Sequence, residues 1–300
     1  MDNRDSAAVP GTLYVVATPI GNLEDITLRA LAVLRSVDLV AAEDTRKTAQ
    51  LLRHFDISVP LLSYYAHNET VRAPELVDRL RNGAAIALVT TAGTPCISDP
   101  GYRVVAAAAA AGLPVVPVPG PSAAAAALSA SGLPTDAFVF EGFLPKKPGK
   151  RATRLKALAT DPRTLILYES PQRILALVES MLPVFGNRPA VLARELTKRY
   201  EEFVRGGLGD IFETLRRRGD IKGECTLLVA GRAEEEAVSW ADAREAIRRG
   251  LATRSKGLSE LAREVAHAHG LPRQAVYEEA LAIKSDRTGF DSESEGCPKD

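Results

Sequence analysis

The sequence predicts an α/β protein made of two α/β domains and a small C-terminal group of helices. Short apolar runs alternate with helix-periodic segments through the first 120 residues, and the composition changes at the proline-rich stretch 117–122. A second alternating series follows that stretch. The divisions that we expect are an N-terminal domain over 11–120, a second domain over 121–235, a helical appendage over 236–283 and a disordered tail over 284–300.

The composition is that of a globular chain with no overall charge. Hydrophobic residues make up 46%, and Lys plus Arg equals Asp plus Glu at 38 each, so any surface for a polyanion must be local. Cys96, Cys225 and Cys297 are too scattered for a zinc site, which favours reduced thiols and no metal. The first nine residues lack the apolar core of a signal peptide, and the apolar run 104–112 is too short to span a bilayer. We therefore expect a cytoplasmic protein with no membrane contact.

The N-terminal domain is predicted to contain a mainly parallel sheet. Its strand-like runs are Leu13–Thr18, Asp38–Ala42, Pro60–Tyr64, Ile86–Val89 and Val115–Val118. Helical patterns separate these runs, as in parallel α/β sheets. Asp25 or Thr27 can cap the first helix and Asp44 or Thr45 the second, and a third helix is expected over 69–81.

Four loops follow predicted strands and are expected to meet at one crevice. They are Thr18–Asn22, Glu43–Arg46, Thr90–Pro100 and Pro119–Ser122. The carboxyl ends of parallel strands form the ligand crevice in open α/β sheets, and Gly93 would let backbone approach a ligand there. For the stretch 86–101 alone, an ordinary strand-to-helix turn is the alternative interpretation.

The second domain has the same alternating character. Its strand-like runs are Ala137–Phe143, Thr164–Tyr168, Ala190–Ala193 and Thr226–Ala230. Ser122 is a candidate N-cap for the alanine-rich helix after the junction, with the helix dipole directed at the crevice. Near the C-terminus, two helical patterns flank Gly270–Pro272 and resemble a helix-turn-helix pair, although such pairs are more often packing appendages.

Several common catalytic motifs are missing from the sequence. It contains no Walker lysine, no His-Glu-x-x-His site and no Gly-x-Ser-x-Gly elbow, which argues against nucleoside triphosphate hydrolysis, zinc hydrolysis and an α/β-hydrolase mechanism. Glu43 and Asp44 are adjacent carboxylates followed by Arg46. A capped helix start explains that spacing as well as catalysis does.

One charge run lies at the entry to a predicted helix. Six bases occur with no acid between them, namely Lys146, Lys147, Lys150, Arg151, Arg154 and Lys156. Such a run is usually a solvated face, and phosphate binding is the competing interpretation.

Six motifs in order make the chain similar to a known family. They are Thr18–Leu23, Ala42–Arg46, Ala92–Pro95 with Ser98–Gly101, Pro119–Ser122, Glu141–Pro145 and Arg194–Lys198. From about Gly11 to about Ile283 the chain resembles the bacterial 16S ribosomal RNA cytidine 2′-O-methyltransferases, a branch of the tetrapyrrole methylase superfamily. Two positions depart from the family's usual pattern, Thr91 where Asp is usual and Gln172 where His is frequent.

The resemblance implies two α/β domains of the tetrapyrrole methylase type with S-adenosylmethionine in the cleft between them, usually in a homodimer. The substrate would be the ribose of a decoding-centre cytidine (cytidine 1402) in the 16S RNA of the small ribosomal subunit. By analogy, the cofactor-binding residues would be Pro19, Gly21, Asn22, Ala92, Gly93, Thr94, Pro95, Gly120, Pro121 and Ser122.

Transfer of a methyl group to a ribose hydroxyl needs alignment of the reacting atoms and a group that accepts the proton. We predict that Glu43, Asp44 and Asp99 supply this group. The predicted RNA-binding residues are Arg46, Lys146, Lys147, Lys150, Arg151 and Lys198. Two other functions stay open at this point, a methyltransferase acting on a tetrapyrrole and a ribosome-binding factor without activity.

Overall fold

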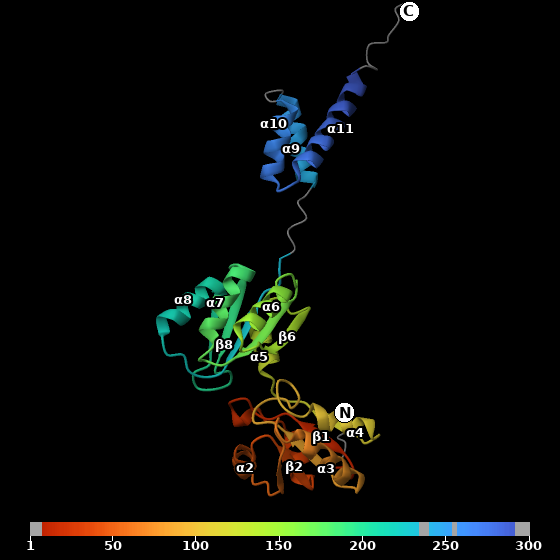
Figure 1. Ribbon diagram of the computed structural model, residues 1–300, viewed down its shortest axis with the longest axis vertical. Helices are drawn as coiled ribbons and strands as arrows, with labels where there is room; N and C mark the ends of the chain where they lie inside the picture. Colours follow the sequence, from red (N-terminus) through yellow and green to blue (C-terminus); the bar gives the residue numbers. More distant parts are fainter. Residues whose placement is uncertain (1–7, 234–239, 254–256, 292–300) are drawn as a thin grey trace, which may run out of the picture. The chain divides into compact units, whose positions relative to one another are not determined.

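The computed structural model describes residues 8–233, 240–253 and 257–291, with side chains up to residue 285. Within that part of the chain, two compact units divide between residues 232 and 233 (Figure 1). The first unit carries two five-stranded sheets, and the second consists of helices. The sequence placed further divisions at 120/121 and 235/236, and these boundaries stay predictions.

The first sheet is wholly parallel, as the alternation predicted. Its strands are β1 (Leu13–Val16), β2 (Leu39–Ala42), β3 (Leu61–Ser63), β4 (Ile86–Val89) and β5 (Val115–Val118), in the order β3-β2-β4-β1-β5. Every pairing between neighbours is parallel, with Val16 opposite both Val89 and Val118. The carboxyl ends of the strands therefore lie along one edge, where the candidate loops begin.

Helices cover both faces of the first sheet because each strand is apolar on both sides. Alternate residues such as Val16 and Val40 pack with α1 (Leu28–Ser36) and α2 (Thr45–His54). The intervening residues, such as Leu13 and Ile86, pack with α3 (Glu69–Arg81) and α4 (Tyr102–Ala110). Thr27 caps α1 and Asp44 caps α2, which decides between the alternatives that the sequence left open. A short 3₁₀ helix, η1 (Leu23–Asp25), precedes α1.

The second sheet is mixed. Its strands are β6 (Phe138–Phe143), β7 (Thr164–Glu169), β8 (Pro189–Arg194), β9 (Glu202–Gly207) and β10 (Cys225–Val229), in the order β6-β7-β10-β8-β9. Only the β6–β7 pairing among these strands is parallel. The sequence analysis missed β9, an edge strand that contains two charged residues and ends in two glycines.

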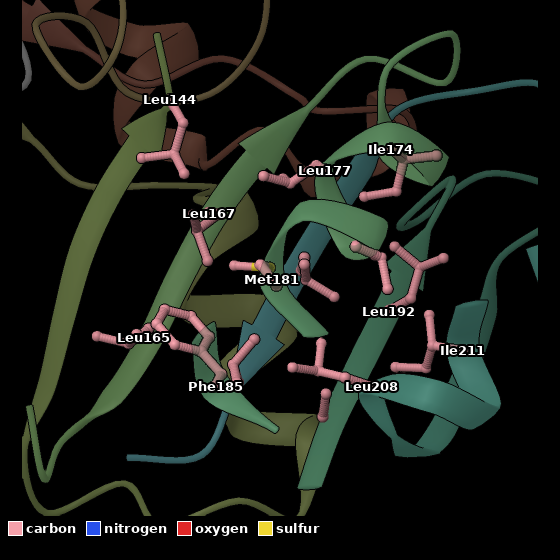
Figure 2. Packing of buried hydrophobic residues seen from close by; sticks show 14 of the residues in the cluster. Leu144, Leu165, Leu167, Ile174, Leu177, Met181, Phe185, Leu192, Leu208 and Ile211 are labelled. Atoms are coloured by element: carbon pink, nitrogen blue, oxygen red, sulfur yellow. The ribbon is translucent and has the colours of Figure 1, made fainter. Parts of the chain in front are cut away.

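The core of the second domain lies on the face of the sheet that carries α6 (Pro148–Leu158), α7 (Ile174–Phe185) and α8 (Leu208–Arg218). Figure 2 shows side chains of α7 and α8, among them Met181 and Ile211, packed against Leu167 and Leu192 of the sheet. The other face of the sheet packs against α5 (Ala123–Ser131). Ile20 from the loop after β1 joins this second cluster, so the loops of the first sheet contact the second domain.

The C-terminal unit contains α9 (Trp240–Thr253), α10 (Leu258–Ala268) and α11 (Arg273–Asp291) around a core that includes Ile247, Leu261 and Val276. The predicted pair around Gly270–Pro272 corresponds to α10 and α11. Residues 284–291 are helical where the sequence predicted disorder, because helix formation is cooperative and continues past the last core residue. Residues 292–300 lie outside the described residues. None of the helices described is long and apolar enough to cross a membrane.

Candidate active site

The loops after β1 and β4 are joined at the carboxyl edge of the first sheet. Thr18 and Gly93 exchange backbone hydrogen bonds of 2.9 and 3.0 Å, and the Thr18 hydroxyl donates to the Thr90 carbonyl at 3.1 Å. Two of the four predicted loops thus form one continuous wall of a site.

The loop after β4 has an unusual backbone. Besides Gly93 and Gly101, the non-glycine residues Cys96 and Ser98 have φ values of 72° and 64°. Residues with a β-carbon adopt this left-handed region infrequently, and such strain concentrates at functional sites. A β-carbon at Gly101 would lie 2.7 Å from the Cys96 sulfur, so only glycine fits there.

Glu43 and Asp99 meet at Thr90. Glu43 follows the end of β2, and its Oε2 accepts hydrogen bonds from the Thr90 hydroxyl at 2.8 Å and the Thr91 amide at 2.9 Å. Asp99 lies close enough to Thr90 and Glu43 for both residues to affect its pKa. We call Glu43, Thr90 and Asp99 the carboxylate cluster. It unites two of the three predicted catalytic residues, which are 56 positions apart in the chain.

The two carboxyl groups of the cluster have different proton affinities. Burial raises the pKa of Asp99 to about 6, opposed by the hydrogen bond from Thr90 and aided by the negative charge of Glu43. Burial also raises the pKa of Glu43, but hydrogen bonds from Thr91 and Thr90 and the charge of Lys47 outweigh burial and leave that pKa below its ordinary value. A carboxyl group that titrates near neutral pH beside one that stays ionised is typical of acid–base sites.

Asp44 has a structural position. Its side chain accepts from the backbone amides of Arg46 and Lys47 at 2.9 and 3.4 Å, which makes it the N-cap of α2. Hydrogen bonding to Arg46, against a small desolvation effect, lowers its pKa. Arg46 is exposed, with its Nε 3.5 Å from the Asp44 carboxylate. The structure does not bring Asp44 into the carboxylate cluster, and its catalytic role stays a prediction.

The predicted cofactor loops 92–95 and 120–122 lie against each other. The Thr94 hydroxyl donates to the Pro121 carbonyl at 3.2 Å, and a β-carbon at Gly120 would lie 3.0 Å from the Ala17 β-carbon. Ala92, Pro95 and Ser122 complete these two loops. The walls are therefore made of small side chains and backbone, a cradle in which a ligand can approach the main chain closely.

Tyr168 from the second domain caps α5, which the sequence analysis assigned to Ser122. Ser122 occupies the N-cap position but makes no side-chain capping hydrogen bond. Instead the Tyr168 hydroxyl accepts from the Ala124 amide at 3.0 Å. The Tyr168 ring packs edge-on against Phe140 and Phe143, with ring centroids 4.9 and 5.8 Å apart. A distant residue thus takes over the cap, and no local pattern could have shown it.

Lys198 lies at the contact between the two domains. A β-carbon at Gly21 would lie 2.5 Å from Lys198 Cγ, so the predicted cofactor loop 19–22 packs closely on the loop 195–198. The Lys198 ammonium binds Glu195 at 2.8 Å and Glu224 at 3.0 Å. These two carboxylates neutralise the Lys198 ammonium, which was predicted to bind RNA. That role of Lys198 therefore stays a prediction. Asn22 caps η1 through its side-chain oxygen.

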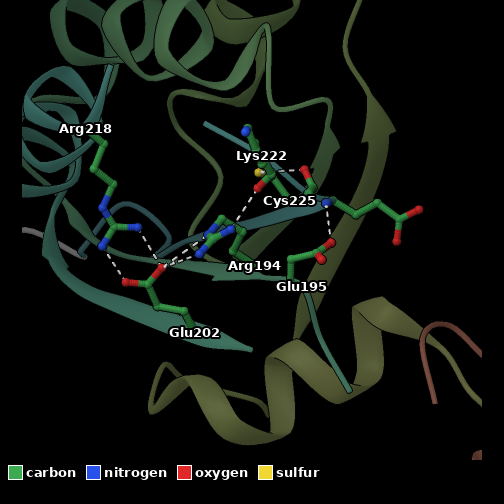
Figure 3. Close-up of polar contacts among 8 residues, drawn as sticks. Arg194, Glu195, Glu202, Arg218, Lys222 and Cys225 are labelled. Carbon is green, nitrogen blue, oxygen red and sulfur yellow. Dashed lines mark hydrogen bonds and ion pairs between the residues drawn. The ribbon is translucent and has the colours of Figure 1, made fainter. Parts of the chain in front are cut away.

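A second ionic network holds the same region of the second sheet. Glu202 on β9 binds Arg194 on the neighbouring strand and Arg218 at the end of α8 (Figure 3). Arg194 also donates to the Lys222 carbonyl at 2.8 Å. This network fixes the strand that leads into the loop 195–198, where Glu195 and Thr197 have positive φ values.

The basic run surrounds the start of α6. Lys147 is the N-cap residue, without a side-chain capping hydrogen bond, and no acidic residue occurs in the first turn. Arg154 forms a bidentate ion pair with Glu141 at 2.7 and 2.6 Å. Within the described residues, Lys146, Lys147 and Lys150 form no ion pair, and bases at a helix N-terminus oppose its dipole. Together with Arg151, they suit an anionic partner.

A hollow of about 230 Å³ borders the carboxylate cluster. We call it the α2 hollow, and it is lined by Thr18, Pro19, Leu23, Lys47, Thr48, Gln50, Leu51, Thr90 and Thr91. Gln172 instead lines a separate hollow of about 440 Å³, which includes Lys222. Among the described residues, no group of three His, Cys, Asp or Glu side chains is arranged to hold a metal ion.

Three roles were not predicted from the sequence. Thr90 links the two carboxylates, Tyr168 caps α5 and Lys47 lines the α2 hollow. The position of Thr90 directly after a buried strand was the one available signal. Lys47 follows Asp44 and Arg46 in the sequence, and its own position carries no distinguishing signal.

Comparisons with known proteins give consistent results. Residues 12–211 match the family model of the Tetrapyrrole (Corrin/Porphyrin) Methylases. The chain is 46% identical over 284 residues to the Ribosomal RNA small subunit methyltransferase I of Micromonospora olivasterospora, covering 93% of this chain and 89% of the relative. It is 47% identical over 272 residues to the protein of that name from Xylella fastidiosa, covering 90% and 99%.

Solved structures share the fold at lower identity. A cobalt precorrin-4 methyltransferase aligns with a TM-score of 0.55 and 20% identity, covering 73% of this chain and 95% of that one. A uroporphyrin-III C-methyltransferase from Thermus thermophilus in complex with S-adenosylhomocysteine aligns with a TM-score of 0.52 and 19% identity, covering 73% and 97%. These likenesses confirm the predicted two-domain α/β fold.

Proposed function

The chain belongs to the tetrapyrrole methylase family, and from this membership we propose that it is an S-adenosylmethionine-dependent methyltransferase of the small-subunit ribosomal RNA. We propose the ribose 2′-hydroxyl of cytidine 1402 in 16S RNA as the group that is modified. The carboxylate cluster carries the chemical part of the proposal, because it places a carboxyl group of pKa about 6 beside the predicted cofactor loops.

The residues present suit S-adenosylmethionine. The loops 92–95 and 120–122 form a cradle of small residues, and the ionised Glu43 favours a cationic ligand nearby. When bound, the cofactor supplies an electrophilic methyl group. Gly93, Thr94 and Pro121 would contact it through backbone groups.

We assign the proton transfer to Asp99. When bound, the cofactor would supply the methyl group that the ribose oxygen accepts, and the Asp99 carboxylate would accept the proton that the hydroxyl loses. Glu43 stays ionised and holds the Thr90 hydroxyl, which keeps the loop after β4 in place. Because the reaction is an in-line displacement, much of the remaining rate enhancement comes from positioning.

Thr91 fits this assignment although relatives usually carry Asp there. Its amide donates to Glu43 at 2.9 Å, and its hydrogen bonding helps to lower the pKa of that carboxyl group. A neutral donor at this position stabilises the ionised Glu43, whereas a third carboxylate would repel it. The substitution is therefore compatible with an active site.

RNA binding is assigned to the basic run. Lys146, Lys147, Lys150 and Arg151 lie at the start of α6, where phosphate groups would neutralise charges that oppose the helix dipole. Arg46 is exposed on α2 and is a further candidate for a phosphate contact.

Two rival functions fit the observations less well. The relatives named as ribosomal RNA methyltransferases are 46–47% identical to this chain, whereas the aligned corrin and porphyrin enzymes are 19–20% identical. The relatives are named as methyltransferases, which disfavours a ribosome-binding factor without activity.

We also propose that the protein acts as a homodimer. Val71 on α3 is 76% exposed and Tyr102 on α4 is 74% exposed, and these two helices pack on the same face of the first sheet. Contiguous exposed apolar patches mark interaction surfaces, and we assign Val71 and Tyr102 to such a patch. Sedimentation of the wild type and of a Val71→Glu, Tyr102→Glu variant tests this, since the variant is expected to be monomeric.

The central experiment is transfer of a labelled methyl group to small subunits that lack the modification. Naked 16S RNA and a tetrapyrrole precursor serve as parallel substrates, and cofactor binding is measured by calorimetry. We expect label on one cytidine ribose of the subunit. Label on the tetrapyrrole, or cofactor binding without transfer to either RNA substrate, would contradict the proposed function.

A further inference from the structure

The α2 hollow has a distinct chemical character. One wall consists of Thr18, Thr90 and Thr91 at the strand ends, and Leu23, which is 40% exposed, adds an apolar contact. The lining from α2 includes Lys47 and Gln50, both of which are exposed. Such a hollow offers hydrogen bonds, an apolar contact and one positive charge to a small polar ligand.

Lys47 is available to a ligand. It is exposed and forms no ion pair within the described part of the chain. Asp44, its nearest acidic neighbour on α2, is already occupied by backbone amides. The positive charge of Lys47 lowers the pKa of Glu43, but the Glu43 carboxylate accepts its hydrogen bonds from Thr90 and Thr91.

Thr90 belongs both to the hollow and to the carboxylate cluster. A substrate group in the hollow therefore lies next to the position where the ribose hydroxyl must be held. S-adenosylmethionine has no phosphate group, whereas every ribose in RNA is flanked by phosphodiesters. Lys47, which lines this hollow and forms no ion pair within the described residues, therefore matches the backbone of the RNA substrate rather than the cofactor.

We propose that the α2 hollow is a subsite for the RNA segment that carries the target ribose, and that Lys47 binds a phosphodiester adjacent to that ribose. This inference rests on the proposed function. Lys47 acts as a positioning residue, since it holds the substrate and takes no part in proton transfer. Gln50, which is exposed, offers hydrogen bonds to the sugar of the same segment.

The test uses the full chain with Lys47→Gln, Lys47→Arg and, as a matched control, Arg53→Gln. Arg53 is an exposed cation on the same helix outside the hollow. We expect Lys47→Gln to raise Kd and KM for unmodified small subunits about fivefold, with kcat and cofactor affinity unchanged. The plot of log K against log salt concentration has a negative slope, and the magnitude of this slope should decrease by about 0.7 for the lost phosphate contact. Lys47→Arg should restore binding, and Arg53→Gln should behave as wild type.

Two results would overturn the subsite. One is an unchanged salt slope in Lys47→Gln, and the other is a Lys47→Arg variant as weak as Lys47→Gln, which would indicate a role of side-chain shape rather than charge. Failure of the proposed function looks different, because the wild-type protein would then transfer no methyl group to the subunit. If the wild type transfers the methyl group and the Lys47→Gln variant binds the subunit with unchanged affinity, only the subsite is contradicted.

Discussion

Asp99 shows how a residue's environment sets its chemistry. An ordinary Asp is fully ionised at neutral pH and is a weak base, whereas Asp99 has a pKa of about 6 because it is buried next to Glu43. A base whose pKa lies near the working pH is more effective at accepting a proton. The same burial makes the ionised Asp99 costly for the folded state.

The activity should depend on pH through this carboxyl group. We expect kcat for methyl transfer to rise as pH increases through about 6 and then to level off, since Asp99 must be ionised to accept the proton. Asp99→Asn should lower kcat by about 10²- to 10⁴-fold and remove this dependence. A pH profile of both proteins measures this. An Asp99→Asn variant with wild-type kcat would exclude the assigned base.

Asp99→Asn should lower kcat but raise the stability of the folded state. A folded-state pKa above the unfolded value of 3.8 means that the protonated group stabilises the fold below about pH 4, and this contribution is lost as pH rises through about 6. Above that pH, Asp99→Asn should be more stable than wild type by roughly 1 kcal/mol after allowance for solvent screening. Urea unfolding at pH 5 and pH 8 checks the sign, and equal stabilisation at pH 5 and pH 8 would contradict it.

At the scale of elements, α6 carries basic residues at its N-terminus, where positive charge does not stabilise the helix. The basic residues at its start gain nothing from the helix dipole, so we relate them to RNA. In a Lys147→Ala, Arg151→Ala variant, subunit affinity should fall and the salt slope should decrease by about 1.4 to 1.8. Cofactor affinity should stay constant. The matched control is Arg216→Ala, Arg217→Ala on α8, and an equal loss in both variants would point to a general charge effect.

The start of α5 depends on a residue from another element. Tyr168→Phe keeps the ring that packs on Phe140 and Phe143 but removes the oxygen that accepts from the Ala124 amide. We expect a loss of about 1–2 kcal/mol in the free energy of unfolding, because a partly buried amide is left without a partner. Urea denaturation measures it, with Tyr200→Phe at a 66% exposed position as control. Equal stability of both variants would show that water replaces the cap.

Elements with a strong local pattern were predictable from the sequence. The parallel strands of the first sheet are uniformly apolar and are bounded by turns, so they were found with the correct order of strand, loop and helix. The edge strand β9 was missed because charged residues and glycines obscure its alternation. Resemblance to a family then supplied the cofactor and the reaction, which the pattern of apolar residues could not provide.

The site was predictable only in part, because its assembly depends on contacts between distant residues. Glu43 and Asp99 were expected near the crevice from their positions after strands, but their link through Thr90 depends on the pairing of β2 with β4. The cap of α5 by Tyr168 and the neutralisation of Lys198 by Glu195 and Glu224 arise between separate elements. Sequence spacing carries no signal for such contacts.

At the scale of the whole molecule, the candidate active site and the C-terminal helices belong to different compact units. The carboxylate cluster, the cofactor loops and the α2 hollow all lie in the first unit, which has its own apolar cores on both sheets. The C-terminal helices enclose a separate core that includes Ile247 and Val276. Each unit therefore has the packing needed to fold without the other.

A chain ending at Ala233 tests this division. It retains the hydrogen bond from the Arg232 amide to the Asp161 carbonyl at 2.7 Å, which ties the end of the first unit to the second domain. Because the residues of the predicted cofactor site are all present, we expect its S-adenosylmethionine affinity to stay within about twofold of wild type. In calorimetry the full chain should show one additional unfolding transition that the shortened chain lacks. A single shared transition in the full chain, or a shortened chain that no longer unfolds cooperatively, would show that the C-terminal helices are part of one folding unit with the site.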